Sequence, residues 1–135
     1  MIVLDASVVI KWVLTDEQLS GAALGWRDRH VSGEDRIAVP ELLFYEIGNV
    51  FATKTPLSAA DAVGGLSLIA DSELDAYTLG MDEFTEAIRL SKHFKISLYD
   101  SSYLALAAAL GCEMITADAR LVSRVKQLRY CRLLQ

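Results

Sequence analysis

Residues 1–13 read MIVLDASVVIKWV, and the fold is predicted from the pattern of apolar and polar residues that begins here. Residues 2–4 form a short apolar run that ends at Asp5. Beyond Ser7, apolar residues recur at the spacing of a helix. The stretch therefore predicts a strand, a turn and a helix, with an acidic side chain directly after the strand.

The rest of the chain repeats this alternation of strand and helix. Apolar runs predict further strands at residues 36–39, 73–78, 114–116 and 130–134. Apolar spacing and capping residues predict helices from Thr15 or Asp16 toward His30, from Pro40 to about Lys54, from Ser58 to about Ala70, from Asp82 to Phe94, from Leu98 to a stop at Gly111, and from Leu121 to Leu128. Alternating strands and helices predict a three-layer α/β fold with a mainly parallel central sheet.

Composition limits the classes of protein to which the chain can belong. Its 135 residues are 53% hydrophobic, which suits a single domain over residues 1–135. The two cysteines have no CxxC spacing, so neither a disulfide framework nor a zinc knuckle is indicated. No basic leader precedes the first apolar run, and no uncharged apolar run approaches the roughly 20 residues of a membrane span. We therefore expect a cytoplasmic protein without a membrane partner.

The net charge of -5 provides no general attraction to nucleic acid, so binding would need a local basic patch or metal ions. One stretch offers such a patch, because residues 120–132 contain five cations and no acid. They are Arg120, Arg124, Lys126, Arg129 and Arg132. The stretch suits contact with phosphates or with an acidic partner, and it equally suits a solvated helix face.

Four acidic residues stand in apolar surroundings. Glu46 falls at the border of the apolar face of its helix, at about 100° per residue. Asp100 is the only charged residue between Lys95 and Glu113. Asp5 and Asp118 each follow a predicted strand, at the sheet edge where open α/β sheets bind ligands. Burying such carboxylates costs free energy unless something neutralises them.

Helix capping explains part of this pattern. Asp5, Asp100 and Asp118 each stand near a predicted helix start, where Asp commonly accepts backbone N–H groups. Capping does not explain Glu46 inside a helix, nor the lack of Lys or Arg on the same faces. A hard cation with oxygen ligands supplies the missing charge, which points to Mg²⁺ or Mn²⁺. Such an ion can activate water for hydrolysis of phosphodiester bonds.

Four short segments at these acids resemble one known family. They are Asp5-Ala6-Ser7, Glu46-Ile47-Gly48-Asn49, residues 99–107 (YDSSYLALA) and residues 116–121 (TADARL). In this order and at this chain length they resemble PIN-domain proteins, and specifically the VapC-type toxins of toxin-antitoxin pairs. The resemblance spans almost the entire chain.

The resemblance implies a metal-dependent endoribonuclease. Asp5, Glu46, Asp100 and Asp118 would be the catalytic and metal-binding acids, with Mg²⁺ or Mn²⁺ as cofactor and RNA as substrate. Supporting polar groups would come from Ser7, Thr116 and Asn49. The family also implies a homodimer and a cognate antitoxin, whose arginine-bearing tail can enter the acidic pocket.

Other functions fit the sequence less well. A haloacid-dehalogenase-like phosphatase requires a second Asp two positions after the first, where this chain has Ser7. A receiver domain requires its phosphorylated Asp after a central strand and a Lys near the end of a late strand, and neither is found. His30 and His93 stand among basic neighbours, so surface positions near helix ends are expected for both. A catalytically inactive PIN-like module that only binds protein stays open as the alternative.

Overall fold

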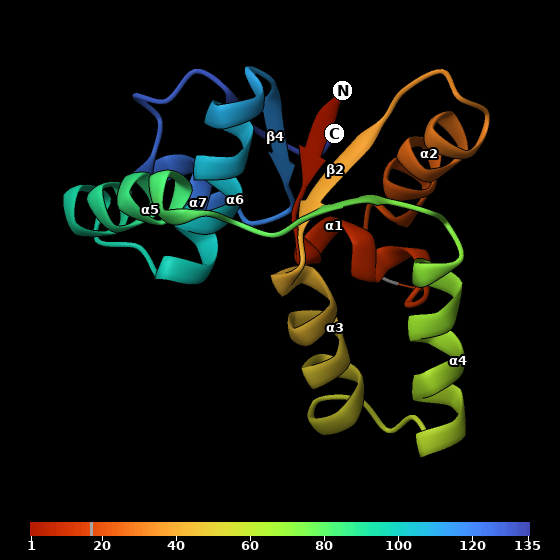
Figure 1. Ribbon diagram of the computed structural model, residues 1–135. Helices are drawn as coiled ribbons and strands as arrows, with labels where there is room; N and C mark the ends of the chain where they lie inside the picture. Colours follow the sequence, from red (N-terminus) through yellow and green to blue (C-terminus); the bar gives the residue numbers. More distant parts are fainter. Residues whose placement is uncertain (17) are drawn as a thin grey trace.

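The computed structural model describes residues 1–16 and 18–135, and its centre is one sheet of five parallel strands in the order β3-β2-β1-β4-β5 (Figure 1). The strands are β1 (Ile2–Leu4), β2 (Ile37–Pro40), β3 (Asp75–Tyr77), β4 (Glu113–Thr116) and β5 (Cys131–Leu133). All five strands that the sequence predicts are present, and their parallel pairing confirms the predicted fold class. Strand β1 lies in the middle, where Ile2 pairs with Ile37 on one side and with Glu113 on the other.

Helices cover both faces of the sheet. On one side lie α1 (Ala6–Val9), the 3-10 helix η1 (Ile10–Trp12), α2 (Ser20–Val31), α3 (Leu42–Thr53) and α4 (Ala59–Ala70). On the other side lie α5 (Met81–Phe94), α6 (Leu98–Leu110) and α7 (Ala119–Arg124) (Figure 1). This division follows from the strand order. The chain runs from β1 outward to β3 and then returns to β4 and β5 on the other side of β1. Because the crossovers are right-handed, reversing this direction places the later helices on the opposite face of the sheet.

Helix α6 passes through the core and sets the position of one acidic residue. It contacts β1, β2 and β4, and most of its residues from Ser101 to Ala107 are buried. Ser97 caps its first turn, and Gly111 ends it with a φ of 62°, a left-handed value that glycine adopts without a Cβ penalty. The predicted limits of this helix are confirmed.

Three predicted helix starts are wrong. Helix α2 begins at Ser20 instead of near Thr15, because η1 extends the first helical segment and Leu19 turns the chain with a φ of 63°. Pro40 is the last residue of β2 instead of the first turn of α3. The backbone N–H of Glu41 donates to Tyr77, so strand pairing continues past the proline.

The third wrong start is that of α7, which begins at Ala119 and ends at Arg124 instead of spanning residues 121–128. The carboxylate of Asp118 accepts the backbone N–H groups of Arg120 and Leu121 and so fixes an earlier first turn. Apolar periodicity does not detect this start, because Ala119 and Arg120 are exposed.

The core joins both helical layers to the sheet. Strands β1 and β2 are buried along their whole length, and the indole N–H of Trp12 donates to the Ala23 carbonyl oxygen at 2.8 Å. His30 lies in the last turn of α2, where its ring accepts the Ile37 N–H, so the expected position near a helix end is correct. Within the described part of the chain, no helix combines the length and apolar character that crossing a bilayer requires.

Candidate active site

The four acidic residues singled out in the sequence lie on four different elements around the carboxyl ends of β1 and β4. Asp5 follows β1 directly, and Asp118 follows β4 after one residue. Glu46 lies in α3, which begins two residues beyond β2, and Asp100 lies in the first turn of α6. Only 6% of Asp5 is exposed, Glu46 and Asp100 are half-buried, and Asp118 is exposed.

Hydroxyl groups hold the carboxylate of Asp5 in place. Ser7 donates both its backbone N–H and its side-chain hydroxyl to Asp5 Oδ1. Thr116, which is fully buried, donates its hydroxyl to Asp5 Oδ2 at 2.6 Å. Both oxygens of this buried carboxylate therefore have donors, although neither donor carries a positive charge.

The same hydroxyls connect Asp5 to the chain segment that carries Asp118. Thr116 Oγ1 accepts the backbone N–H of Asp118 at 3.0 Å, and Ser7 Oγ accepts the N–H of Ala117 at 2.8 Å. Ser7 and Thr116 were predicted to support the site, and the structure brings both of them to Asp5. The ends of two adjacent strands are thus joined through side chains as well as through the sheet.

Tyr103 positions Glu46, although the sequence analysis did not identify this tyrosine. Its hydroxyl donates a 2.6 Å hydrogen bond to Glu46 Oε1, and only 1% of the residue is exposed. The available sequence signal is a tyrosine among the apolar residues of this helix, three residues after Asp100. A buried Tyr hydroxyl requires a partner, and here the partner is one of the four acids.

The protonation behaviour of the acids shows that they influence one another. Burial raises the pKa of Asp5 to about 6, with a further increase from the charge of Asp100. Burial and the charge of Asp100 also raise the pKa of Glu46. The pKa of Asp100 is raised by burial and by the charge of Asp118. Asp100 is therefore within electrostatic reach of each of the other three acids.

Capping accounts for two of the acids and not for the others. Asp5 and Asp118 are the N-caps of α1 and α7, as the capping interpretation predicts. The same interpretation is wrong for Asp100, because Ser97 caps α6 and accepts the Asp100 N–H at 3.0 Å. Neither Asp100 nor Glu46 has a capping function that would explain a half-buried carboxylate.

The donor set at this edge suits a hard cation. It consists of carboxylate and hydroxyl oxygens, and none of the four acids forms an ion pair with a cation of residues 1–16 and 18–135. Among these residues, no three His, Cys, Asp or Glu side chains stand close enough, as they are oriented here, to hold an ion together. The complete ligand set therefore stays a prediction, and the uncompensated negative charge is the observation that supports it.

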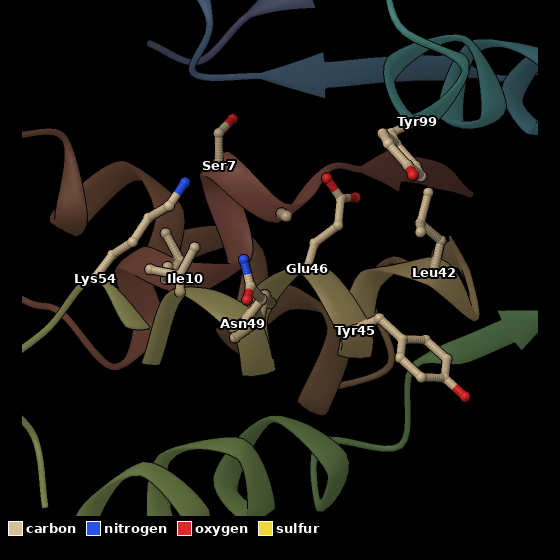
Figure 2. A pocket seen from close by; sticks show the side chains of 11 residues that line it. Ser7, Ile10, Leu42, Tyr45, Glu46, Asn49, Lys54 and Tyr99 are labelled. Atoms are coloured by element: carbon tan, nitrogen blue, oxygen red, sulfur yellow. The ribbon is translucent and has the colours of Figure 1, made fainter. Parts of the chain in front are cut away.

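A pocket of about 590 Å³ opens beside Glu46 and Ser7. Figure 2 shows the carboxylate of Glu46, the amide of Asn49 and the amine of Lys54 on the same side of α3, facing Ser7. Asn49 was predicted as a supporting residue, whereas Lys54 was not identified from the sequence. Tyr99, 60% of which is exposed, lines the pocket next to Asp100.

Comparison with known families gives a match that spans most of the chain. A profile of the PIN domain matches residues 2–128. The chain belongs to the PIN domain family. Ribonuclease VapC9 of Mycobacterium tuberculosis is 34% identical to this PIN domain over 125 residues, which cover 90% of this chain and 88% of VapC9. The resemblance to VapC-type proteins is thereby confirmed.

Solved structures share the fold of this PIN domain. A toxin-antitoxin complex from Klebsiella pneumoniae contains a chain that matches with a TM-score of 0.70 and 17% identity, over 98% of this chain and 96% of the other. VapBC-1 from nontypeable Haemophilus influenzae matches with a TM-score of 0.69 and 14% identity, over 99% and 98% of the two chains. At these identities the likeness shows the fold alone.

Proposed function

We propose that this PIN domain is an endoribonuclease of the VapC type that hydrolyses RNA phosphodiester bonds with the help of Mg²⁺ or Mn²⁺. The 34% identity to a VapC ribonuclease over most of both chains supports the enzyme class. The observation that carries the proposal is the buried carboxylate of Asp5, which has hydroxyl donors and no cationic partner among the described residues. It lies within electrostatic reach of Asp100.

Asp5, Glu46, Asp100 and Asp118 would hold the metal ion. When bound, such an ion supplies a water of lowered pKa and positive charge for the phosphate oxygens. The chain's own contribution is orientation. Ser7 and Thr116 fix both oxygens of Asp5 through hydrogen bonds, and the hydroxyl of Tyr103 fixes one oxygen of Glu46. These residues keep carboxylates in place that would otherwise repel one another.

The pocket beside Glu46 would receive the nucleotide next to the cleaved bond. The exposed Lys54 offers a positive charge for a phosphate, and the Asn49 amide offers a donor and an acceptor for a base edge. The ring of Tyr99 offers a surface on which an unpaired base can stack. RNA as substrate also agrees with the cytoplasmic location expected from the sequence.

We also propose that the protein is the toxin of a toxin-antitoxin pair and forms a homodimer. The Klebsiella and Haemophilus relatives by fold belong to toxin-antitoxin complexes. A groove of about 320 Å³ is lined by exposed apolar side chains, among them Tyr45, Phe84 and Leu98. Burying these side chains against a second copy would stabilise a dimer.

An inactive protein-binding module is the alternative. It would keep Asp5 and Asp118 as helix caps, which is how both are used in the structure. It would not explain why Asp100 lies close enough to Asp5 and Glu46 to raise the pKa of both. The raised pKa values of these three carboxyl groups therefore favour the enzyme.

The test is cleavage of several RNA pools in Mg²⁺, Mn²⁺ and EDTA by the wild type and by Asp5→Asn and Asp100→Asn. We expect metal-dependent cleavage by the wild type and a loss on the order of 100-fold or more in each variant. Asp61→Asn is the matched control, because Asp61 lies in the first turn of α4 and outside the site. If all four proteins cleave RNA equally, or none of them does, the ribonuclease proposal fails and the inactive binding module is favoured.

A further inference from the structure

Four exposed cations form a basic surface beside the acidic site. Lys92 lies in the last turn of α5, and Lys95 follows the end of that helix. Arg120 lies in the first turn of α7 and Arg124 is its last residue. These four residues are referred to below as the basic surface.

One hydrogen bond joins the two halves of the basic surface. Arg124 Nη1 donates to the Lys95 carbonyl oxygen at 2.8 Å, across 29 positions of the sequence. The bond holds the end of α7 against the turn between α5 and α6, which lie on the same side of the sheet (Figure 1). Four cations from two separate segments are thus presented together.

The basic surface adjoins two of the four acids. Lys95 stands two residues before Ser97, the cap of α6, and Asp100 lies in the first turn of that helix. The backbone N–H of Arg120 donates to Asp118 Oδ1 at 2.9 Å. A polymer bound at Asp100 and Asp118 would therefore pass next to these cations.

Acidic side chains do not neutralise the basic surface. None of its four residues has an ion pair within the described ranges 1–16 and 18–135, whereas Arg29, Arg36 and Arg132 elsewhere in the chain are all paired. Between residues 87 and 124 the acids are Asp100, Glu113 and Asp118, and Glu113 pairs with Arg132 at 2.7 Å. The arrangement therefore leaves a local excess of positive charge on a chain whose net charge is -5.

We propose that the basic surface binds the RNA backbone on the side of the site formed by Asp100 and Asp118, an inference that rests on the proposed ribonuclease function. Lys and Arg that contact phosphates displace counterions, which gives RNA affinity without sequence preference. Besides its two arginines, α7 exposes only the small residues Ala119 and Ser123. It lacks the large apolar anchors on which protein interfaces depend, so RNA suits this surface better than a protein partner does.

The structure places the cations of residues 120–132 in different surroundings. Arg132 is neutralised by Glu113, and Arg129 precedes β5 at the amino edge of the sheet, away from the acids. From that stretch the basic surface takes Arg120 and Arg124, whose helix is held to Lys95 and to Asp118 by hydrogen bonds. The other two cations of the basic surface, Lys92 and Lys95, lie at the end of α5, and nothing in the sequence indicates that they are close to α7.

The test is binding of a fluorescently labelled single-stranded RNA, measured by anisotropy at several salt concentrations in EDTA, so that the RNA stays intact. For Lys92→Gln/Lys95→Gln/Arg120→Gln we expect an increase in Kd on the order of 10-fold. The slope of log Kd against log salt should fall by about 0.7 for each of three lost phosphate contacts. Lys92→Arg/Lys95→Arg/Arg120→Lys keeps the charge and should bind as the wild type does.

The matched control is Arg27→Gln/Arg36→Gln/Arg129→Gln, which removes three exposed or half-exposed cations away from the basic surface. It should leave the Kd and the salt slope within about twofold of the wild type, since general charge acts weakly at a distance. Equal loss in both triple variants, no loss in either, or no RNA binding by the wild type would overturn the inference. Cleavage with metal ions by the same proteins is scored separately, so failure of the ribonuclease function alone is distinguishable.

Discussion

Tyr103 and Glu46 lie 57 positions apart and are joined by a 2.6 Å hydrogen bond between the tyrosine hydroxyl and Glu46 Oε1. Tyr103→Phe removes the donor and leaves a half-buried carboxylate with one fewer partner. We expect the free energy of unfolding to fall by about 1–3 kcal/mol, and the pKa of Glu46 to rise further. Urea unfolding and the pH profile of RNA cleavage measure these effects. Tyr99→Phe, which removes an exposed hydroxyl, should leave stability unchanged.

Thr116 provides a second test of how the acids are positioned. Thr116→Val keeps the side-chain shape but removes the hydroxyl that Asp5 Oδ2 and the Asp118 N–H share. We expect a loss of about 1–3 kcal/mol in stability and a clear loss of RNA cleavage. Thr116→Ser restores the hydroxyl and should recover most of the activity. Normal cleavage by the valine variant would show that this hydrogen bond does not orient Asp5 for the reaction.

The raised pKa of Asp5 predicts an unusual dependence of stability on pH. Its folded pKa of about 6 lies above the ordinary value of 3.8, so between these pH values the folded state binds a proton that the unfolded state has released. This proton stabilises the fold below about pH 4, and its contribution of up to about 3 kcal/mol is lost as the pH rises through 6. In EDTA, the free energy of unfolding of the wild type should therefore fall relative to that of Asp5→Asn as the pH rises from about 4 to about 7. A flat difference between pH 4 and 7 would contradict the assignment.

Asp100→Asn separates charge repulsion from structural support. The pKa of Asp100 is raised by burial and by Asp118, so the fold favours a neutral side chain at this position. We expect the melting temperature in EDTA to stay unchanged or to rise slightly, with RNA cleavage lost. Ser97→Ala is the contrasting variant, because it removes the helix cap and should cost about 1 kcal/mol. A large drop in melting temperature for Asp100→Asn would instead indicate a structural role.

Much of the fold could be predicted because its signals are local. Residues 2–4 are a short apolar strand, Met114 and Ile115 form an apolar pair in β4, and α6 carries both a serine cap and a glycine stop. The three helix starts that were wrong depend on contacts made elsewhere in the chain or on exposed residues. Pro40 stays in β2 because the adjacent Glu41 pairs with Tyr77, and apolar spacing does not reveal this contact.

The four carboxylates and the hydroxyls of Ser7 and Thr116 were predicted from the sequence, whereas Tyr103 and Lys54 were not. Asp5, Glu46, Asp100 and Asp118 are detectable because a charge in apolar surroundings is conspicuous. Tyr103 looked like one more core residue, since its hydroxyl finds Glu46 only through the packing of α3 near α6. The connection of Lys95 with Arg124 likewise depends on a backbone carbonyl, which sequence patterns do not show.

The central position of β1 makes the acidic site depend on segments from both ends of the chain. Asp5 is held by Thr116, and the two residues are 111 positions apart, so the constellation of acids exists only after nearly the whole polypeptide has closed on itself. Truncated translation products and proteolytic fragments that lack either segment would carry carboxylates without the arrangement. An acidic site built in this way forms only when the two ends of the chain have come together.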